Sequence, residues 1–180
     1  MSGAVDSSSG KRLLLLRHAK AVPADGTFAD IARPLAPRGE RDSRHMGERM
    51  RRRHERFDLV LASPSVRTRQ TAELVATAVG YPRDKIAFDE RLYLADPEEI
   101  AAVIAAQSPV IRCLLVVGHN PGLSELAHRL SPELAVDDLP TAALVALEVD
   151  IGRWADVTES TNRLEYYDFP KNPNAPTTIR

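Results

Sequence analysis

The chain has 180 residues, of which 43% are hydrophobic and 27% charged. This length suits one domain with a full core, and the composition excludes the disordered and fibrous classes. Its 24 basic and 25 acidic residues leave a net charge of −1, so the overall field gives no reason to expect nucleic acid or a membrane as partner. We expect one domain over residues 11–170, with flexible tails at 1–10 and 171–180.

Two further features predict a cytoplasmic protein. The first apolar run, Leu13 to Leu16, is too short for a signal-peptide core or a membrane span. Cys113 is the single cysteine, which excludes disulfides within the chain. Because Cys113 lies inside an apolar run, we expect a buried, unreactive thiol.

Short apolar runs alternate with segments of helical length and period. In chain order, strands are expected at Leu13–Leu16, Phe57–Ala62, Lys85–Phe88 and Ile111–Val117, and helices at Pro37–Glu55, Pro64–Val79, Pro97–Ala106 and Pro121–Leu130. This alternation predicts an α/β fold, in which a mostly parallel central sheet lies between two layers of helices. Two later strands, Ala142–Val149 and Arg163–Phe169, have no helix between them and are expected to form an antiparallel hairpin at the sheet edge.

Three helix starts share one signal, a capping residue followed by proline. They are Ser63-Pro64, Asp96-Pro97 and Asn120-Pro121. In each pair the polar side chain suits the N-cap, and the proline suits the first helical position. Ser63 is therefore interpreted as a cap rather than a nucleophile.

Basic and imidazole side chains follow three of the predicted strands. Arg17 and His18 end the first run, Arg67 lies one turn beyond the second, and His119 follows the fourth. Ligands of parallel α/β sheets bind at the carboxyl ends of the strands, so these four side chains are expected to converge. Arginine binds two phosphate oxygens at once, while a neutral imidazole attacks phosphorus. The pattern predicts a phosphate site with a histidine nucleophile.

At these residues the chain resembles the histidine phosphatase, or phosphoglycerate-mutase-like, superfamily. The resemblance lies in three blocks, LLLLRHAKA, SPSVRTRQTAE and VVGHNPGLSEL, and spans roughly Leu13 to Phe169. It implies that His18 becomes phosphorylated and that Arg17, Arg67 and His119 bind the transferred phosphoryl group. It also implies catalysis by positioning and charge, with no metal and no cofactor.

The chain departs from the family pattern at two points. Ala19 stands where the family usually has glycine, which is acceptable if its φ is negative. The carboxylic acid that protonates an ester leaving group has no clear match among Asp89, Glu90 and Asp96, and Glu90 is our candidate.

The missing acid bears on the substrate. The imidazole of a phosphohistidine leaves more easily than an alkoxide and needs less help. The short chain, the RHAK variant and the segment RPLAPRGE make the sequence similar to the SixA-like phosphohistidine phosphatases. The expected partner is therefore a phosphorylated protein or a small phosphate ester. The alternatives are a phosphate- or phosphoprotein-binding module that has lost catalysis, and a small-ester phosphatase or mutase of the same superfamily.

Other polar residues are expected to lack a catalytic role. His45, His54 and His128 have no matching context, and arginines around the pocket histidines would repel a metal cation. The run RMRRRHER, from Arg49 to Arg56, is interpreted as a solvated helix face. Lys20, Arg33 and Thr141 are expected either at the mouth of the pocket or on the open surface.

Overall fold

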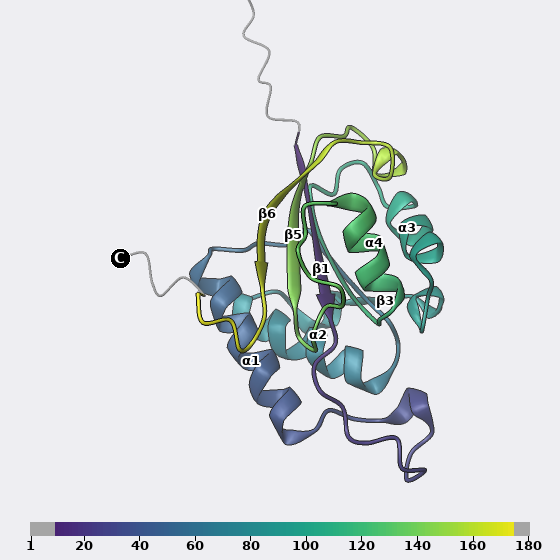
Figure 1. Cartoon of the computed structure of the whole chain (residues 1–180), viewed down its shortest axis with the longest axis vertical. Coiled ribbons are helices and arrows are strands. Elements are labelled where there is room, and N and C mark those ends of the chain that lie inside the picture. Colours follow the sequence, from purple (N-terminus) through teal and green to yellow (C-terminus); the bar gives the residue numbers. More distant parts are fainter. Residues whose placement is uncertain (1–9, 175–180) are drawn as a thin grey trace, which may run out of the picture.

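A six-stranded sheet forms the centre of the protein, which is described by a computed structural model over residues 10–174. The strand order is β3-β2-β4-β1-β5-β6 (Figure 1). Strands β3, β2, β4 and β1 run parallel, whereas β5 is antiparallel to β1 and β6 to β5. The bounds are β1 Lys11–Arg17, β2 Leu59–Ala62, β3 Ala87–Phe88, β4 Cys113–Gly118, β5 Leu144–Val149 and β6 Asn162–Asp168.

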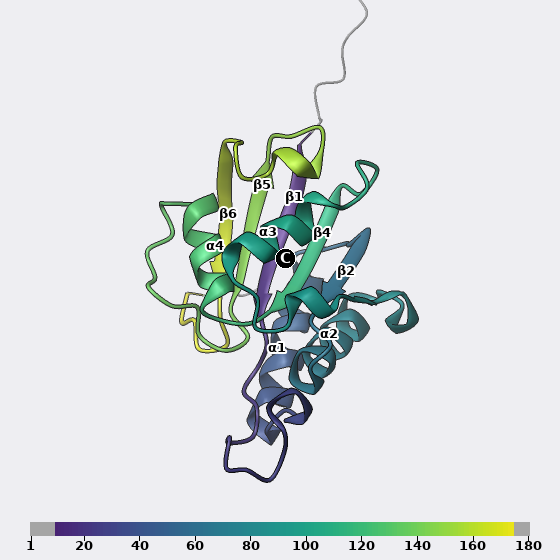
Figure 2. The same cartoon turned by 90° about the vertical axis from the view of Figure 1, so that its right-hand side faces the viewer.

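Strand β1 shows why helices cover both faces of the sheet. Its four leucines are fully buried, and they alternate between two separate apolar clusters. The cluster of Leu13 and Leu15 includes α3 (Pro97–Ala105) and α4 (Gly122–Leu130), while that of Leu14 and Leu16 includes α1 (Pro37–Arg52) and α2 (Val66–Val79). Figure 2 shows α3 and α4 in front of the sheet. The predicted three-layer αβα sandwich is confirmed.

The predicted edge hairpin is present in β5 and β6. The two strands pair antiparallel from Leu144 opposite Asp168 to Val149 opposite Asn162, with an irregularity in register between Ala146 and Leu147. The connection between the strands contains a short 3-10 turn whose Trp154 is fully buried. The hairpin thus adds two antiparallel strands to a parallel sheet.

Each of the four helices differs from its predicted bounds at one end, most clearly α1 and α2. Helix α1 ends at Arg52 rather than Glu55, because the chain turns at His54, whose φ is 57° and left-handed. Helix α2 begins at Val66, and its cap is Ser65, whose Oγ accepts from the Thr68 amide at 3.4 Å. The prediction of a Ser63 cap is therefore wrong.

Of the other two predicted caps, Asp96 is confirmed and Asn120 is wrong. Asp96 Oδ1 accepts from the Glu99 amide at 2.8 Å at the start of α3. Helix α4 begins only at Gly122, after a cis Asn120-Pro121 peptide bond. Asn120 instead donates through Nδ2 to the carbonyl oxygen of Leu139 at 3.0 Å. The polar side chain before Pro121 thus fixes a loop rather than a helix end.

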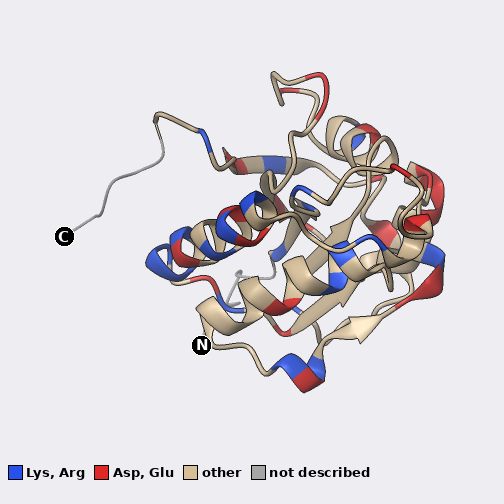
Figure 3. Cartoon of the chain, turned by 90° about the horizontal axis from the view of Figure 1, so that it is seen from below, with Lys and Arg blue, Asp and Glu red and all other residues tan. Residues whose placement is uncertain are grey.

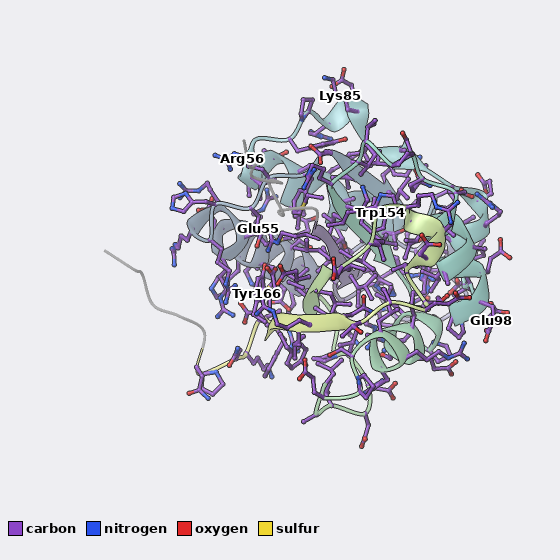
Figure 4. The ribbon with its side chains drawn as sticks, turned by 90° about the horizontal axis from the view of Figure 1, so that it is seen from above. Glu55, Arg56, Lys85, Glu98, Trp154 and Tyr166 are labelled. Atoms are coloured by element: carbon purple, nitrogen blue, oxygen red, sulfur yellow. The ribbon has the colours of Figure 1, made fainter. Side chains whose placement is uncertain are left out.

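Two buried carboxylates, one contacting the start of β1 and the other at the end of β6, hold segments of the chain together. Glu55 accepts two hydrogen bonds from Arg12, at 2.6 and 3.0 Å, and one from the Tyr166 hydroxyl at 2.8 Å (Figure 4). Asp168 is fully buried and accepts from Arg49 and Arg53, both at 2.8 Å. Part of the basic run 49–56 therefore joins α1 to β6 rather than facing solvent alone.

Basic and acidic residues are interspersed along the rest of α1 (Figure 3). Among the described residues, no helix is both long and apolar enough to cross a membrane. The expected tails fall mostly on residues 1–9 and 175–180, which lie outside the described part of the chain.

Candidate active site

The carboxyl ends of three neighbouring strands bring the predicted residues together. Strand β4 lies between β1 and β2. The His18 amide donates to Gly118 O at 3.1 Å, and the Ser63 amide donates to Val117 O at 3.1 Å. These bonds place the segments after β1, β2 and β4 side by side. Arg67 lies in the first turn of α2, which follows β2 at the same edge of the sheet. The predicted convergence follows from this topology.

His18 has one ring nitrogen occupied and the other available. Its Nδ1–H donates to the carbonyl oxygen of Ala19 at 2.8 Å, which leaves the lone pair on Nε2. Burial, followed by the nearby Arg67 and Arg17 charges, lowers the pKa of His18 to about 4, although the Ala19 hydrogen bond opposes this shift. His18 is therefore a neutral imidazole with a free Nε2 at neutral pH.

His119 lies against His18, with ring centroids 5.2 Å apart in an edge-to-face arrangement. Its Nε2–H donates to Ser63 Oγ at 2.8 Å, and its Nδ1 accepts from Arg67 Nη2 at 3.4 Å. Burial and the charges of its neighbours lower the pKa of His119 to about 3. In the resting site, His119 is thus neutral and helps to hold Arg67. Ser63, expected as a cap, orients this histidine.

Arg17 and Arg67, which the sequence predicts to bind phosphate, each have a buried donor without an acceptor among the described residues. Arg17 donates through Nη1 to Leu139 O at 2.6 Å, and Arg67, only 2% exposed, donates through both terminal nitrogens. The Nε–H groups of the two arginines are buried and have no acceptor among residues 10–174. Unsatisfied buried donors are costly, and an oxyanion bound by both guanidinium groups would supply the missing acceptors.

Asp30 is a site residue that the sequence analysis missed. It lies in a 3-10 turn, Asp30–Ala32, on the segment between β1 and α1. Its Oδ2 accepts from Arg67 Nη2 at 3.0 Å and from the Tyr93 hydroxyl at 2.6 Å, and its Oδ1 accepts from Arg33 at 2.8 and 3.0 Å. Its backbone oxygen accepts from Arg67 Nη1 at 2.6 Å. The i,i+3 spacing of Asp30 and Arg33 was the only signal in the sequence, and it is weak.

Besides Arg67, the Asp30 carboxylate is hydrogen-bonded by Tyr93 and Arg33. The Tyr93 ring meets the His119 ring edge to face at 5.6 Å. Burial and the hydrogen bond to Asp30 raise the pKa of the Tyr93 hydroxyl, so it remains a donor at neutral pH. Arg33, which the sequence left open between pocket mouth and open surface, is joined to the site through Asp30.

The remaining residues singled out in the sequence do not belong to the hydrogen-bonded cluster of Arg67, His119 and Asp30. Ala19 is fully buried with a negative φ, as required for its replacement of glycine. Glu90, the candidate acid, is exposed in a 3-10 turn, and its side chain has no hydrogen bond within residues 10–174. Cys113 is partly buried, and burial raises its pKa to about 12, so it stays a thiol. Among the described residues, no group of three or more His, Cys, Asp or Glu is placed to hold a metal ion.

Comparison with known proteins connects this geometry to a family. The chain matches the model of the histidine phosphatase superfamily (branch 1) over residues 13–93. It is 36% identical to the uncharacterized protein Rv1276c of Mycobacterium tuberculosis over 165 residues, which cover 87% of this chain and all of the relative. A solved structure from Nakamurella multipartitia, assigned as a phosphohistidine phosphatase SixA, is 28% identical, with a TM-score of 0.75 over 90% of this chain and 97% of the other.

The chain belongs to the histidine phosphatase superfamily. Within this superfamily it is similar to the phosphohistidine phosphatase SixA of Escherichia coli, with 26% identity over 140 residues, 77% of this chain and 86% of SixA. The superfamily match includes Arg17, His18 and Arg67, whereas His119 lies beyond the matched range. Membership supports phosphatase activity on a phosphorylated ligand.

Proposed function

We propose that this histidine phosphatase hydrolyses phosphohistidine or related phosphomonoesters through a covalent phosphohistidine on His18. The observation that carries the proposal is the state of His18, whose Nδ1 is bound to Ala19 O while Nε2 keeps its lone pair. A nucleophile in this state needs no base to remove a proton before it attacks. No step of the proposal requires a metal.

The reaction proceeds by two displacements at phosphorus. In the first, the Nε2 lone pair of His18 forms an N–P bond while the bond from phosphorus to the leaving imidazole nitrogen or ester oxygen breaks. The leaving imidazole takes up a proton from solvent, and a leaving ester oxygen takes one from the proposed acid, Glu90. In the second, a water oxygen forms an O–P bond, the N–P bond breaks, and the proton lost by water is carried away by phosphate or solvent. Arg17 and Arg67 bind the phosphoryl oxygens. His119 keeps Arg67 in place through Nδ1, and it binds an oxyanion oxygen when its Nε2–H, which donates to Ser63 Oγ in the resting site, turns to the phosphoryl group.

The leaving group determines how much help the site must give. An imidazole nitrogen accepts a proton readily, whereas an alkoxide needs an acid at the moment of bond breaking. Glu90 stays the proposed acid for ester substrates, but its exposed side chain favours substrates that need no such donor. This favours phosphohistidine over alkyl phosphates.

Apolar side chains beside the site support a protein substrate. The described residues include four large hydrophobic side chains that are exposed, namely Phe28, Ile31, Leu94 and Val110. Ile31 and Leu94 directly follow Asp30 and Tyr93, which are hydrogen-bonded to each other at the site, and Phe28 lies in the same segment. Leu94 is also held at a φ of 50°, which is unusual for leucine. An apolar surface of this kind suits contact with another protein better than with a small hydrophilic ester.

The proposal is tested by trapping the intermediate. Enzyme quenched under denaturing conditions during turnover of a phosphohistidine peptide should carry acid-labile, alkali-stable phosphate on His18. His18→Ala should lose both this phosphate and turnover, by at least about 10³-fold, because the nucleophile is absent. The control His45→Ala changes an exposed histidine on α1 and should keep the parent rate.

The outcomes separate the alternatives. Turnover of a small ester at a kcat/KM orders of magnitude above that of the peptide would reject the phosphohistidine assignment but keep the phosphatase. Absence of turnover by the parent protein on every substrate, including activated aryl phosphates, with phosphate binding retained by His18→Ala, would identify a binding module. Dependence on a bisphosphate primer would identify a mutase.

A further inference from the structure

In the resting site, the carboxylate of Asp30 holds the position of a ligand on Arg67. Both terminal nitrogens of this guanidinium group donate to Asp30, one to the backbone oxygen and one to Oδ2. The Tyr93 hydroxyl donates to the same Oδ2 at 2.6 Å. A carboxylate resembles a phosphoryl group in presenting charged oxygens to a fork of N–H donors. Asp30 and a phosphoryl group therefore seek the same guanidinium group.

The two partners of this ion pair differ in freedom. The Arg67 side chain is 2% exposed and lies on α2, against His119, whereas that of Asp30 is 44% exposed. Asp30 lies in a segment, residues 23–31, whose side chains are all exposed. When an anion enters, it is Asp30 that can move away without disturbing the core.

Arg33 provides a second charged partner for Asp30. It is the C-cap of the same 3-10 turn, donates to Oδ1 at i,i+3 spacing, and also binds the carbonyl oxygen of Val22, just before residues 23–31. Leaving Arg67 would therefore not leave the Asp30 charge unpaired. This lowers the cost of the exchange, since the ion pair between Asp30 and Arg33 can be kept.

Asp30 is poorly suited to be the missing acid. The hydrogen bond from Tyr93, and those from Arg33 and Arg67, hold the pKa of Asp30 well below its usual range. A carboxyl group that stays ionised donates no proton to a leaving group. Its contacts with Arg67 thus call for a different explanation.

We propose that Asp30 competes with the phosphoryl group for Nη2 of Arg67, so that its carboxylate is displaced when phosphate binds the unpaired Nε–H together with Nη2, and returns when phosphate leaves. The inference rests on the proposed function, in which Arg67 binds the phosphoryl oxygens. Its consequence is a limit on phosphate affinity: the returning carboxylate prevents the product from remaining on the arginines. Asp30 is in this sense a residue that sets product release rather than a catalytic residue.

The test is a direct measurement of inorganic phosphate binding by calorimetry, at constant pH and ionic strength, on the full chain. Asp30→Asn removes the competing charge while keeping size and the backbone contact with Arg67. It should bind phosphate about three- to tenfold more tightly, the size expected for loss of one partly screened charge contact. The inhibition constant of phosphate in turnover assays should fall by the same factor.

Two further variants sharpen the result. Tyr93→Phe keeps the ring beside His119 but removes one hydrogen bond to Asp30, so it should shift phosphate affinity in the same direction by a smaller factor. Asp25→Asn is the matched control, because Asp25 lies in the same segment and its carboxylate is hydrogen-bonded only by Thr27 among the described residues. It should leave phosphate affinity unchanged.

The opposite sign overturns the inference. If Asp30→Asn binds phosphate more weakly than the parent, Asp30 positions Arg67 for its ligand and does not compete with it; unchanged affinity also rejects competition. Both outcomes leave the proposed function intact, because the parent protein still binds phosphate. If neither protein binds phosphate, this inference and the proposed function fail together.

Discussion

The two histidines of the site are neutral for one shared reason, which is burial beside arginines. Burial is the largest cause of the lowered pKa in both His18 and His119, and the charge of Arg67 adds to it. A neutral His18 has the lone pair that the proposed attack on phosphorus needs, and a neutral His119 can accept the hydrogen bond from Arg67. The neutral form of each histidine is thus favoured by burial and by the charges of its neighbours.

This state predicts the acid limb of the rate profile. The value of kcat/KM reports ionisations of the free enzyme, and protonation of His18 abolishes the nucleophile. After correction for ionisation of the substrate phosphate, kcat/KM should therefore fall only near pH 4, where His18 takes up its proton, rather than near the ordinary histidine value of about 6.5. A limb near pH 6.5 in protein whose circular dichroism is unchanged would contradict the assignment.

For single residues, the sequence was most informative where the three motif blocks and the predicted strands pointed to the same positions. Four predicted site residues each follow a strand or lie one turn after it, namely Arg17, His18, Arg67 and His119. Because the carboxyl ends of parallel strands lie at one edge of the sheet, the predicted parallel arrangement of the strands alone brings them together. Asp30 and Tyr93 could not be found in this way, since they lie on irregular segments 63 residues apart whose contact depends on loop conformation. Ser63 was misassigned because its hydrogen bond to His119 replaces a local bond to the helix.

Among the elements, two helices begin in direct contact with backbone beside the site. A Cβ added to Gly39, in the first turn of α1, would lie 2.1 Å from the carbonyl oxygen of Lys20, and one added to Gly122, at the start of α4, would lie 2.0 Å from that of Ala95. Only glycine permits this approach. Through Gly122, α4 fixes the chain three residues after His119.

We therefore expect Gly122→Ala to damage both stability and activity. The methyl group meets a backbone carbonyl that cannot rotate away, so α4 must shift, at a cost of about 1–3 kcal/mol in the free energy of unfolding. The shift would move His119 and lower kcat. Gly152→Ala is the control, because Gly152 has no neighbour within 4 Å of the added carbon, and urea denaturation compares the two variants. Equal stability of both variants would show that the α4 start is not tightly packed.

Whether a segment forms a helix or a strand was easier to predict than the residues at which it begins and ends. The alternation of apolar runs and helical segments identified the α/β sandwich, because strand and helix periods are properties of whole segments. Helix ends depend on single side chains, which tertiary contacts can recruit. Asp96 caps α3 as expected, since its side chain has no other hydrogen-bond partner within residues 10–174, whereas the Asn120 side chain donates to the carbonyl oxygen of Leu139.

For the whole molecule, burial of two neutral imidazoles makes the free energy of unfolding depend on pH in the acid range. Between the folded values, about 4 for His18 and about 3 for His119, and the unfolded value of about 6.5, the unfolded chain binds more protons than the folded one. The free energy of unfolding should therefore fall as pH falls through this window, by a few kcal/mol in total. Carboxylates with lowered pKa, such as Asp30, contribute their loss only at lower pH.

Denaturation with urea at several pH values between 6.5 and 4 would measure this dependence. His119→Gln removes one buried imidazole and should reduce the slope of stability against pH, whatever its effect on absolute stability. His45→Asn changes an exposed histidine and should leave the slope as it is. If the two variants have the same slope, the buried site does not account for the acid sensitivity.

The strand order also determines how the molecule behaves among its own copies. One edge of the sheet is β3, which has only two residues, and the other is β6, whose Arg163 and Glu165 are engaged by Glu148 and Arg12. A short edge offers few free backbone groups, and a charged edge resists addition of another strand. The sheet is therefore protected against edge-to-edge aggregation at both ends, so concentrated solutions should remain free of β-linked fibrils.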